Sequence, residues 1–175
     1  YHVDSVSLGE QGWVQFRRYG KAEQPAAAQQ PETATPDRNP QKSATHGGRK
    51  RDFEWWAEGN TLRIRNTDGL EHSYELPEII AVLAKLHQQF GSDWFPLGNN
   101  VEKLYRETER PGFGTTIYAQ PNSNTLHAQG ASYLGVILQQ VGILEWKNER
   151  KEIEWRIGLL PLTPSALLRQ LKPAA

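Results

Sequence analysis

The sequence predicts an α+β fold, in which a small antiparallel sheet is followed by several helices, a β-hairpin and a short C-terminal helix. Two observations lead to this class. In residues 52–76 apolar residues alternate with polar ones, which is the period of a half-buried strand. From residue 77 onward the apolar residues recur every three or four positions, which is the period of an amphipathic helix.

The composition limits the chemistry that the chain can carry. Its 175 residues suffice for a domain with its own core, and its formal net charge is zero. Because cysteine is absent, disulfides, thiolate metal sites and cysteine nucleophiles are excluded. No apolar run has the length of a membrane span, so no membrane partner is expected. Methionine is absent and the chain begins at Tyr1, so we expect a processed or excised fragment. The N-terminus lacks the basic-then-apolar pattern of a signal peptide, so a cytoplasmic location is the default expectation.

The N-terminal part of the chain divides into three segments. Residues 1–20 are expected to form a β-hairpin, because alternating apolar residues flank a glycine-containing turn at residues 9–12. Residues 21–51 are expected to be a disordered linker or loop, because four prolines and a polar filling supply no apolar period. Residues 52–76 predict a β-meander with turn signals between its strands.

Three helices are expected next. The first begins at Pro77, where a missing N–H costs nothing, and ends at Gly91. A short second helix follows a cap at Asn99 or Asn100, and a loop is expected after it. The third helix begins near Thr125 and ends at a glycine. Its expected buried stripe consists of Leu126, Leu134, Ile137, Leu138 and Val141.

The residues after the third helix predict a β-hairpin over 143–157, which we call the wing. Its second arm, residues 151–157, alternates apolar and charged residues. Three helices followed directly by such a hairpin, with an apolar helix that ends in glycine within residues 130–146, resemble the winged helix-turn-helix superfamily. The resemblance covers residues 77–158 and implies a small DNA-binding or partner-binding module.

A short amphipathic helix is expected within residues 159–175. Thr163 has the position of an N-cap and is followed by a proline, which suits the first turn of a helix. The leucines on one side of this helix are Leu167, Leu168 and Leu171. We expect this side either to pack on the domain or to meet a protein partner or a second copy of the chain.

The outward face of the third helix supplies the candidates for reading DNA. If its apolar stripe is buried, the opposite face carries Gln129, Ser132, Tyr133 and Gln140, which are expected to face the major groove of a duplex. Glutamine can pair with adenine, and hydroxyl groups can reach phosphates or base edges. Residues 125–140 contain no lysine or arginine, however, so a solvated or protein-binding face is the alternative.

Two basic segments are expected to contact the DNA backbone. The first lies on the wing and contains Lys147, Arg150 and Lys151, although glutamates interleave with them, so cross-strand ion pairs are the alternative. The second ends the linker and consists of Arg49, Lys50 and Arg51. A flexible basic arm commonly wraps nucleic acid, and plain linker behaviour is its alternative.

The leading functional expectation is a DNA-binding winged-helix module of a regulatory or DNA-processing complex. The alternative is a protein-interaction or dimerisation module, which the zero net charge and the cation-free third helix favour. A nuclease or other enzyme is the last alternative, because Glu152 and Glu154 lie near Lys151 but lack a third metal ligand in register. The five histidines show no metal-ligand spacing, so no catalytic residue, cofactor or metal is expected.

Overall fold

The computed structural model describes residues 7–8, 14–15 and 39–172. The chain divides into two units, residues 1–36 and 37–175. In the first unit, β1 (Ser7–Leu8) pairs antiparallel with β2 (Val14–Gln15). Both strands fall within the hairpin expected for residues 1–20. Most of the expected linker, residues 21–38, lies outside the described residues.

The second unit begins with an antiparallel sheet in the strand order β3-β4-β5-β6. Its strands are β3 (Gln41–Ala44), β4 (Asp52–Glu58), β5 (Thr61–Asn66) and β6 (Glu71–Glu75). A two-residue turn joins β4 to β5 and contains Gly59 at φ 59°, a left-handed conformation that glycine adopts without steric cost. The small antiparallel sheet predicted from the alternation is therefore present.

Strand β3 corrects the expectation that residues 21–51 form a disordered linker. It pairs with the start of β4, so that Gln41 lies opposite Trp55 and Ala44 lies opposite Asp52. The Ser43 hydroxyl accepts a hydrogen bond from the Trp55 indole at 3.1 Å and donates one to Gln140 at 2.7 Å. An edge strand held by main-chain and polar side-chain hydrogen bonds needs no apolar face, so its sequence carries no alternation.

The two faces of this sheet differ in character. The inward side chains that are almost completely buried include Trp55, Leu62, Ile64 and Tyr74. On the opposite face, one row crosses all four strands through Lys42, Glu54, Arg65 and Glu71. The signs of charge alternate along this row, so neighbouring strands attract one another and the solvent-facing surface is compensated in charge.

A series of helices follows the sheet. They are α1 (Leu76–Phe90), α2 (Val101–Tyr105), α3 (Phe113–Tyr118), α4 (Thr125–Gln129) and α5 (Ala131–Gln140). Helix α1 lies where a helix was expected from Pro77 to Gly91. Helix α2 is the expected short helix, and its cap is Asn100, whose side chain accepts a hydrogen bond from the Lys103 N–H at 3.0 Å. The fold is therefore mixed α+β.

Two expectations for this region are wrong. The loop expected after α2 contains α3, because Phe113 and Ile117 lie one helical turn apart and are both fully buried. The expected third helix is divided at Gly130, where α4 ends and α5 begins. Leu126 consequently projects from α4 into solvent and does not join the buried stripe of α5.

The wing consists of β8 (Leu144–Trp146) and β9 (Glu154–Ile157), joined by a loop over residues 147–153. Its second arm is shorter than expected, because pairing begins at Glu154. A further strand, β7 (Phe95–Pro96), pairs with the other edge of β9 and gives the order β7-β9-β8. Trp155 pairs with residues of both neighbouring strands and is fully buried, so it anchors the wing to the core.

Helix α6 (Pro164–Leu171) begins after Thr163, whose hydroxyl oxygen accepts a hydrogen bond from the Ala166 N–H at 3.2 Å. The helix packs against α1 and β4, and both Leu167 and Leu171 are buried there. Of the two alternatives expected for this side of the helix, packing on the domain therefore holds for these two leucines, because the chain itself covers them. Leu168 is half-buried against the same core.

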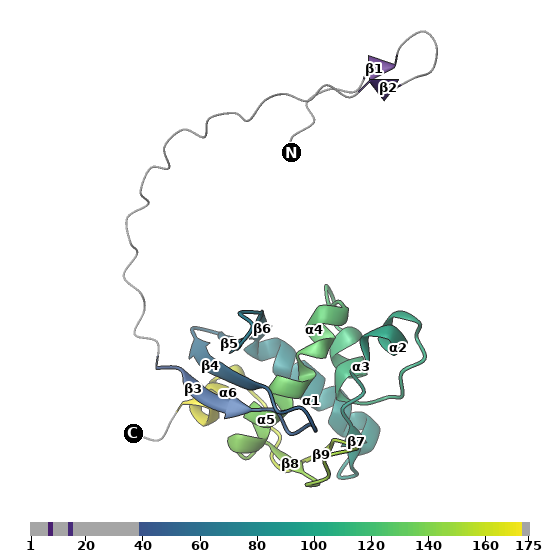
Figure 1. Cartoon of the computed structure of the whole chain (residues 1–175). Coiled ribbons are helices and arrows are strands. Elements are labelled where there is room, and N and C mark those ends of the chain that lie inside the picture. The colour runs from purple at the N-terminus through teal and green to yellow at the C-terminus, as the bar shows by residue number, and fades with distance from the viewer. Residues whose placement is uncertain (1–6, 9–13, 16–38, 173–175) are drawn as a thin grey trace. The chain divides into compact units, whose positions relative to one another are not determined.

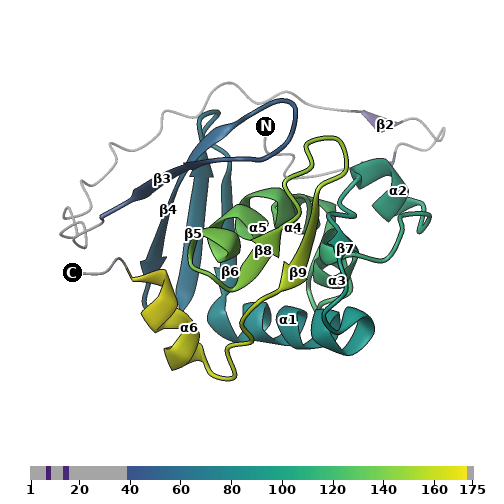
Figure 2. The ribbon, with the colours of Figure 1, turned by 90° about the horizontal axis from the view of Figure 1, so that it is seen from below.

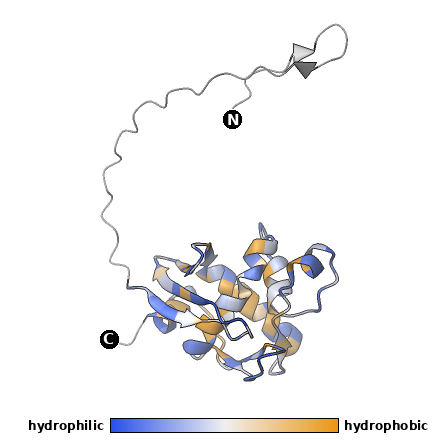
Figure 3. Ribbon diagram, in the orientation of Figure 1, coloured by the Kyte–Doolittle hydropathy of each residue, from blue (hydrophilic) through white to orange (hydrophobic). Residues whose placement is uncertain are grey.

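Helix α5 lies between the two sheets of the second unit and contacts β3 and β8. Figures 1 and 2 show α5 flanked by the four-stranded sheet and by the wing. Seven of its ten residues are buried. Figure 3 shows that the helices in the centre carry many of the hydrophobic residues, whereas the connecting loops are mainly hydrophilic. Most of the surface of α5 is therefore unavailable to a ligand.

Candidate functional site

The loop between β3 and β4 lies against the wing. His46 of this loop stacks on Trp146 of β8, with ring centroids 3.7 Å apart and the ring planes 2° from parallel. The His46 ring also makes a hydrogen bond of 3.2 Å with the Gln139 side chain of α5. A Cβ atom placed on Gly47 would lie 3.7 Å from the side chain of Ile153 in the wing. Two segments about one hundred residues apart in the sequence are thus in contact (Figures 1 and 2).

This contact brings together the two basic segments expected from the sequence. We call the five exposed cations Arg49, Lys50, Arg51, Arg150 and Lys151 the basic rim. The β3–β4 loop, residues 45–51, contains no acidic residue. Among the described residues, the ion pair made by the rim is a long one of 3.9 Å between Arg51 and Asp68. The rim is therefore largely free to attract an anion.

Lys147 differs from the rest of the expected basic set. Its ammonium group lies 2.6 Å from the Glu154 carboxylate and 3.6 Å from that of Glu149. The hydrogen bond that the Lys147 ammonium group donates to Glu154 raises the pKa of Lys147 above its ordinary value, although the side chain is open to solvent. The cross-strand ion pairing considered from the sequence therefore occurs at Lys147, and this residue is not part of the rim.

A cleft with a volume of about 600 Å³ opens beneath the basic rim. Its walls come from the β3–β4 loop, the start of α2, the junction of α4 and α5, and the wing. Arg49 and Arg51 are its basic residues, and polar side chains are supplied by Asn99, Asn100, Gln129 and Ser132. The lining also contains one carboxylate, that of Glu102, which pairs with Arg106 at 2.8 Å. Apolar wall is supplied by Leu97, Val101, Tyr133, Ile153 and Trp155. The cleft thus combines cations, amides and apolar surface in one place.

The residues expected to face the major groove do not form one surface. Gln129 is exposed and Ser132 is partly exposed, and both line the cleft. Gln140 is also exposed, but it lies at the other end of α5, where it accepts the hydrogen bond from Ser43. Tyr133 is only 5% exposed, so the expectation that it faces outward is wrong.

Tyr133 is buried because the four-stranded sheet covers it. Its ring lies edge-on to Phe53, with centroids 5.1 Å apart, and 5.4 Å from the His72 ring. The Asn66 amide donates a hydrogen bond of 3.4 Å to its hydroxyl. Helical periodicity predicted which residues share a face of α5, but it could not show that a second sheet packs on that face.

His72 lies at the back of the cleft on β6. Burial lowers the pKa of His72 below its ordinary value, and the nearby His127 lowers it further, so the ring is neutral at pH 7. Its Nε2 atom is buried and makes no hydrogen bond with any described residue. The Nε1 atom of Trp155, another residue of the cleft wall, is unpaired in the same way.

The neutral His72 makes stability depend on pH. Because its folded pKa lies below the unfolded value of about 6.5, the unfolded chain takes up a proton more readily. The contribution of neutral His72 to the free energy of unfolding is therefore present above about pH 6.5 and is lost as the pH falls. We expect the thermal unfolding temperature to fall between about pH 7.5 and pH 5.5, and to fall less in His72→Asn.

The matched control for this pH prediction is His87→Asn, because His87 is exposed on α1. Its pH profile is expected to match that of the wild-type chain. His46 contributes in the same direction as His72, since burial also lowers its pKa, so the slope will not vanish in the single variant. Unfolding curves measured by circular dichroism give the test, and a profile for His72→Asn as steep as the wild type contradicts the assignment.

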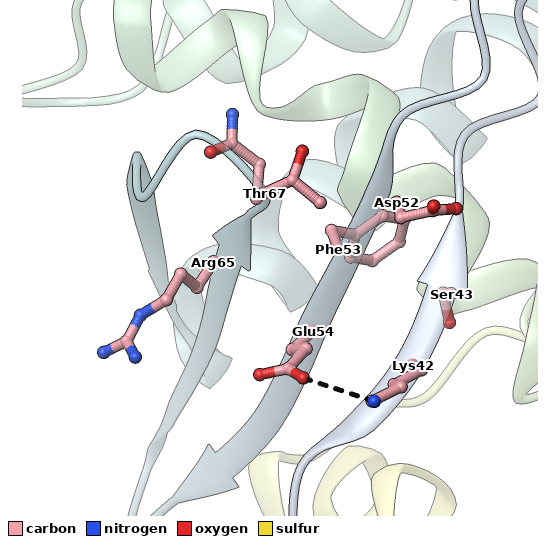
Figure 4. A pocket seen from close by; sticks show the side chains of 8 residues that line it. Lys42, Ser43, Asp52, Phe53, Glu54, Arg65 and Thr67 are labelled. Carbon is pink, nitrogen blue, oxygen red and sulfur yellow. Dashed lines mark ion pairs between the residues drawn. The ribbon is translucent and has the colours of Figure 1, made fainter.

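A second hollow of about 600 Å³ lies over the four-stranded sheet (Figure 4). Lys42 and Glu54, which pair at 4.0 Å, and Arg65 belong to its lining. Arg65 is itself bonded to Glu71 at 2.7 Å. Because its cations are already paired with carboxylates, this hollow is a weaker candidate for an anionic ligand than the cleft beneath the basic rim.

The acidic residues considered for a nuclease do not assemble a metal site. Glu154 is bonded to Lys147, and Glu152 is exposed on the wing loop. Within residues 7–8, 14–15 and 39–172, no group of three or more His, Asp or Glu side chains is placed to hold a metal ion. None of the helices in the same residues is long and apolar enough to cross a bilayer.

Several residues of the cleft were not singled out from the sequence. His46 holds the two loops together by stacking on Trp146, which lies outside the lining, and Asn99 donates a hydrogen bond of 3.0 Å to the Gln129 carbonyl. These residues lie in different segments, and none of them belongs to a motif with recognisable spacing. Comparison with protein-family models, with curated proteins and with solved structures found no match to this chain.

Proposed function

We propose that this protein binds duplex DNA through the basic rim. The observation that carries the proposal is the contact between the β3–β4 loop and the wing, made by His46 and Trp146. It brings the β3–β4 loop, whose Arg49 and Arg51 line the cleft, against the wing, whose loop carries the exposed Arg150 and Lys151, although the net charge of the chain is zero. A local cluster of unpaired cations is what the phosphate backbone of a duplex requires.

The element order supports the winged-helix interpretation as part of this proposal. Helices lead directly into a hairpin. Helix α5 is the last helix before β8, which is the position of the third helix in a winged helix-turn-helix. In winged helix-turn-helix proteins, such a helix enters the major groove. Here the four-stranded sheet covers much of α5, so only its start, near Gln129 and Ser132, is open on the side of the cleft.

This arrangement favours contacts with the DNA backbone over reading of bases by a helix. Phosphate contacts position a protein on the duplex and carry no sequence information of their own. The open part of α4 and α5 offers Gln129 and Ser132 but no lysine or arginine, so the commonest contact with guanine is lacking there. We therefore propose binding that depends weakly on sequence and strongly on salt.

The salt dependence of binding tests the proposal. Each phosphate neutralised lowers the logarithm of the association constant by about 0.9 per tenfold increase in salt. If all five rim cations take part, affinity for a short duplex will fall roughly 500-fold between about 50 mM and 200 mM salt. Fluorescence anisotropy of a labelled duplex measures this change. No binding at the lower salt concentration would refute the proposed function.

A protein partner is the second candidate, and one observation favours it. Val101 and Tyr105 of α2 are exposed, and so is Leu126 of the neighbouring helix α4. Exposed apolar residues on adjacent helices are typical of interaction surfaces. Concentration-dependent sedimentation of the purified chain tests this candidate. A monomer at high concentration counts against self-association.

A further inference from the structure

We infer that the cleft beneath the basic rim receives an unpaired nucleotide of the bound DNA. This inference rests on the proposed function and gives the cleft a role that the rim alone does not explain. A duplex that lies on the rim presents its phosphates outward and keeps its bases stacked inside. The interior of the cleft would then have no part in binding.

The lining of the cleft has the chemistry of a nucleotide site. A nucleobase has flat apolar faces and polar edges, and Tyr133, Ile153 and Trp155 provide apolar wall while Gln129 and Asn99 provide amides. The Gln129 side chain is exposed and makes no hydrogen bond within the described part of the chain. Its amide is therefore free to pair with a base edge.

The two arginines are placed for the phosphate of the same nucleotide. Arg49 and Arg51 belong to the lining of the cleft and to the rim. A guanidinium group can bind two phosphate oxygens at once, which fixes the orientation of a nucleotide as well as attracting it. The cations are complementary to a phosphate group. The amides and the apolar wall beneath them are complementary to the base that this phosphate group carries.

The volume of the cleft also suits one nucleotide better than a helix of DNA. At about 600 Å³ it falls within the range of small-ligand sites, about 300–1,000 Å³. A base pair within a stack cannot enter such a space, whereas an unpaired or extruded nucleotide can. This difference makes single-stranded overhangs, bulges and junctions the preferred DNA.

The wall of the cleft also covers two ring nitrogens without hydrogen-bond partners among the described residues. His72 Nε2 and Trp155 Nε1 both belong to lining residues and have no hydrogen-bond partner among the described residues. Buried polar atoms without a partner are rare in folded proteins. Because protein covers both nitrogens, the exposed amide of Gln129 supplies the polar contact to the edge of a base.

The test compares DNAs that share a duplex and differ in unpaired nucleotides. Fluorescence anisotropy is measured at low salt with a blunt duplex, with the same duplex carrying a 5′ or a 3′ overhang, and with one carrying a bulge. We expect at least one unpaired form to bind about tenfold more tightly than the blunt duplex, since stacking of one base on a protein supplies a gain of this order.

The variant Val101→Trp assigns this preference to the cleft. Val101 is 39% exposed and lines the cleft, so an indole at this position narrows it without entering the core. We expect the preference for unpaired DNA to vanish while binding of the blunt duplex changes less than about twofold. The matched control is Leu126→Trp, on α4, where the residue is 46% exposed and is not part of the lining. Ser132→Tyr is a second variant that fills the cleft from α5, should Val101→Trp prove unfolded by circular dichroism.

The outcomes separate the two proposals. Equal binding of all DNAs by the wild-type chain, or a preference that survives both cleft-filling variants, overturns the nucleotide inference and leaves binding by the rim intact. Absence of binding to every DNA overturns the proposed function together with the inference. Self-association that Val101→Trp abolishes, with no preference among the DNAs, assigns the cleft to a second copy of the chain and also overturns the inference.

Discussion

The triple variant Arg49→Glu, Arg150→Glu, Lys151→Glu is expected to bind duplex DNA at least about a hundredfold more weakly than the wild-type chain. All three side chains are exposed, and none forms an ion pair with a described residue, so their charges are available to phosphates. Three lost contacts also flatten the dependence of binding on salt by about three units of slope. The measurement is anisotropy of a blunt duplex over a series of salt concentrations.

A matched control separates the rim from the overall charge of the protein. Lys85→Glu, Arg169→Glu, Lys172→Glu changes the net charge by the same amount at exposed positions on α1 and at the C-terminal helix. None of these residues lines the cleft. We expect this control to reduce affinity less than about fivefold, through the long-range field alone, and to keep the salt slope. Equal losses in the two triple variants would mean that the rim has no special role in binding.

The sequence predicted those parts of the fold that have a local period. The alternation at Leu62, Ile64 and the residues between them gave β5, and the spacing of Ile79, Leu83 and Leu86 gave α1. The wing was predicted in the same way, because Trp155 and Ile157 alternate with charged residues. In each case one face of a single element is buried, so the spacing of the apolar residues in the sequence shows directly which residues are buried.

The parts that could not be predicted depend on contacts between distant segments. Strand β3 has no apolar period and exists because β4 pairs with it and Ser43 bonds to Trp55 and Gln140. Tyr133 has the spacing of an outward residue on α5, but Phe53 of the four-stranded sheet covers it. Periodicity shows which residues share a face, and only the tertiary packing shows what lies against that face.

The sequence predicted which residue types form the candidate site, but it did not predict where in the fold they assemble. The basic runs that begin at Arg49 and Arg150 were visible as charge clusters, and Gln129 and Ser132 as polar residues of a helix. Their assembly depends on the stack of His46 on Trp146, which joins two loops that no local pattern relates. A sequence pattern can identify ligands for a phosphate, whereas the cleft arises from packing across the whole second unit.

Gly130 is a position where a very small substitution is expected to have a large effect on stability. Its backbone is helical, with φ −62° and ψ −12°, so no conformational requirement for glycine exists. The requirement is space: a Cβ atom there would lie 2.2 Å from the Tyr74 hydroxyl oxygen and 2.8 Å from Nδ1 of His72. Both distances are shorter than van der Waals contact allows, and both side chains are buried in the core.

The Tyr74 hydroxyl cannot move away without a cost. It donates a hydrogen bond of 2.6 Å to the His127 carbonyl, and burial, with the Glu78 carboxylate, raises the pKa of Tyr74 so that the proton stays in place. Gly130→Ala must break this bond or separate α4 and α5 from β6. Overpacking costs about 1–3 kcal/mol and a lost buried hydrogen bond about 1–3 kcal/mol. Replacing glycine by alanine in a helix returns only about 1 kcal/mol.

We therefore expect Gly130→Ala to lower the free energy of unfolding by about 3 kcal/mol, measured by urea denaturation. Gly48→Ala is the matched control, since nothing lies within 4 Å of a Cβ atom at that exposed position. Its effect is expected to stay within about 0.5 kcal/mol. A double variant that adds Tyr74→Phe removes the clashing oxygen, so its loss of stability should be smaller than the sum of the two single losses. Additive losses would show that the Tyr74 hydroxyl is not the atom that excludes a side chain at Gly130, and a neutral Gly130→Ala would show that the junction of α4 and α5 moves freely against β6.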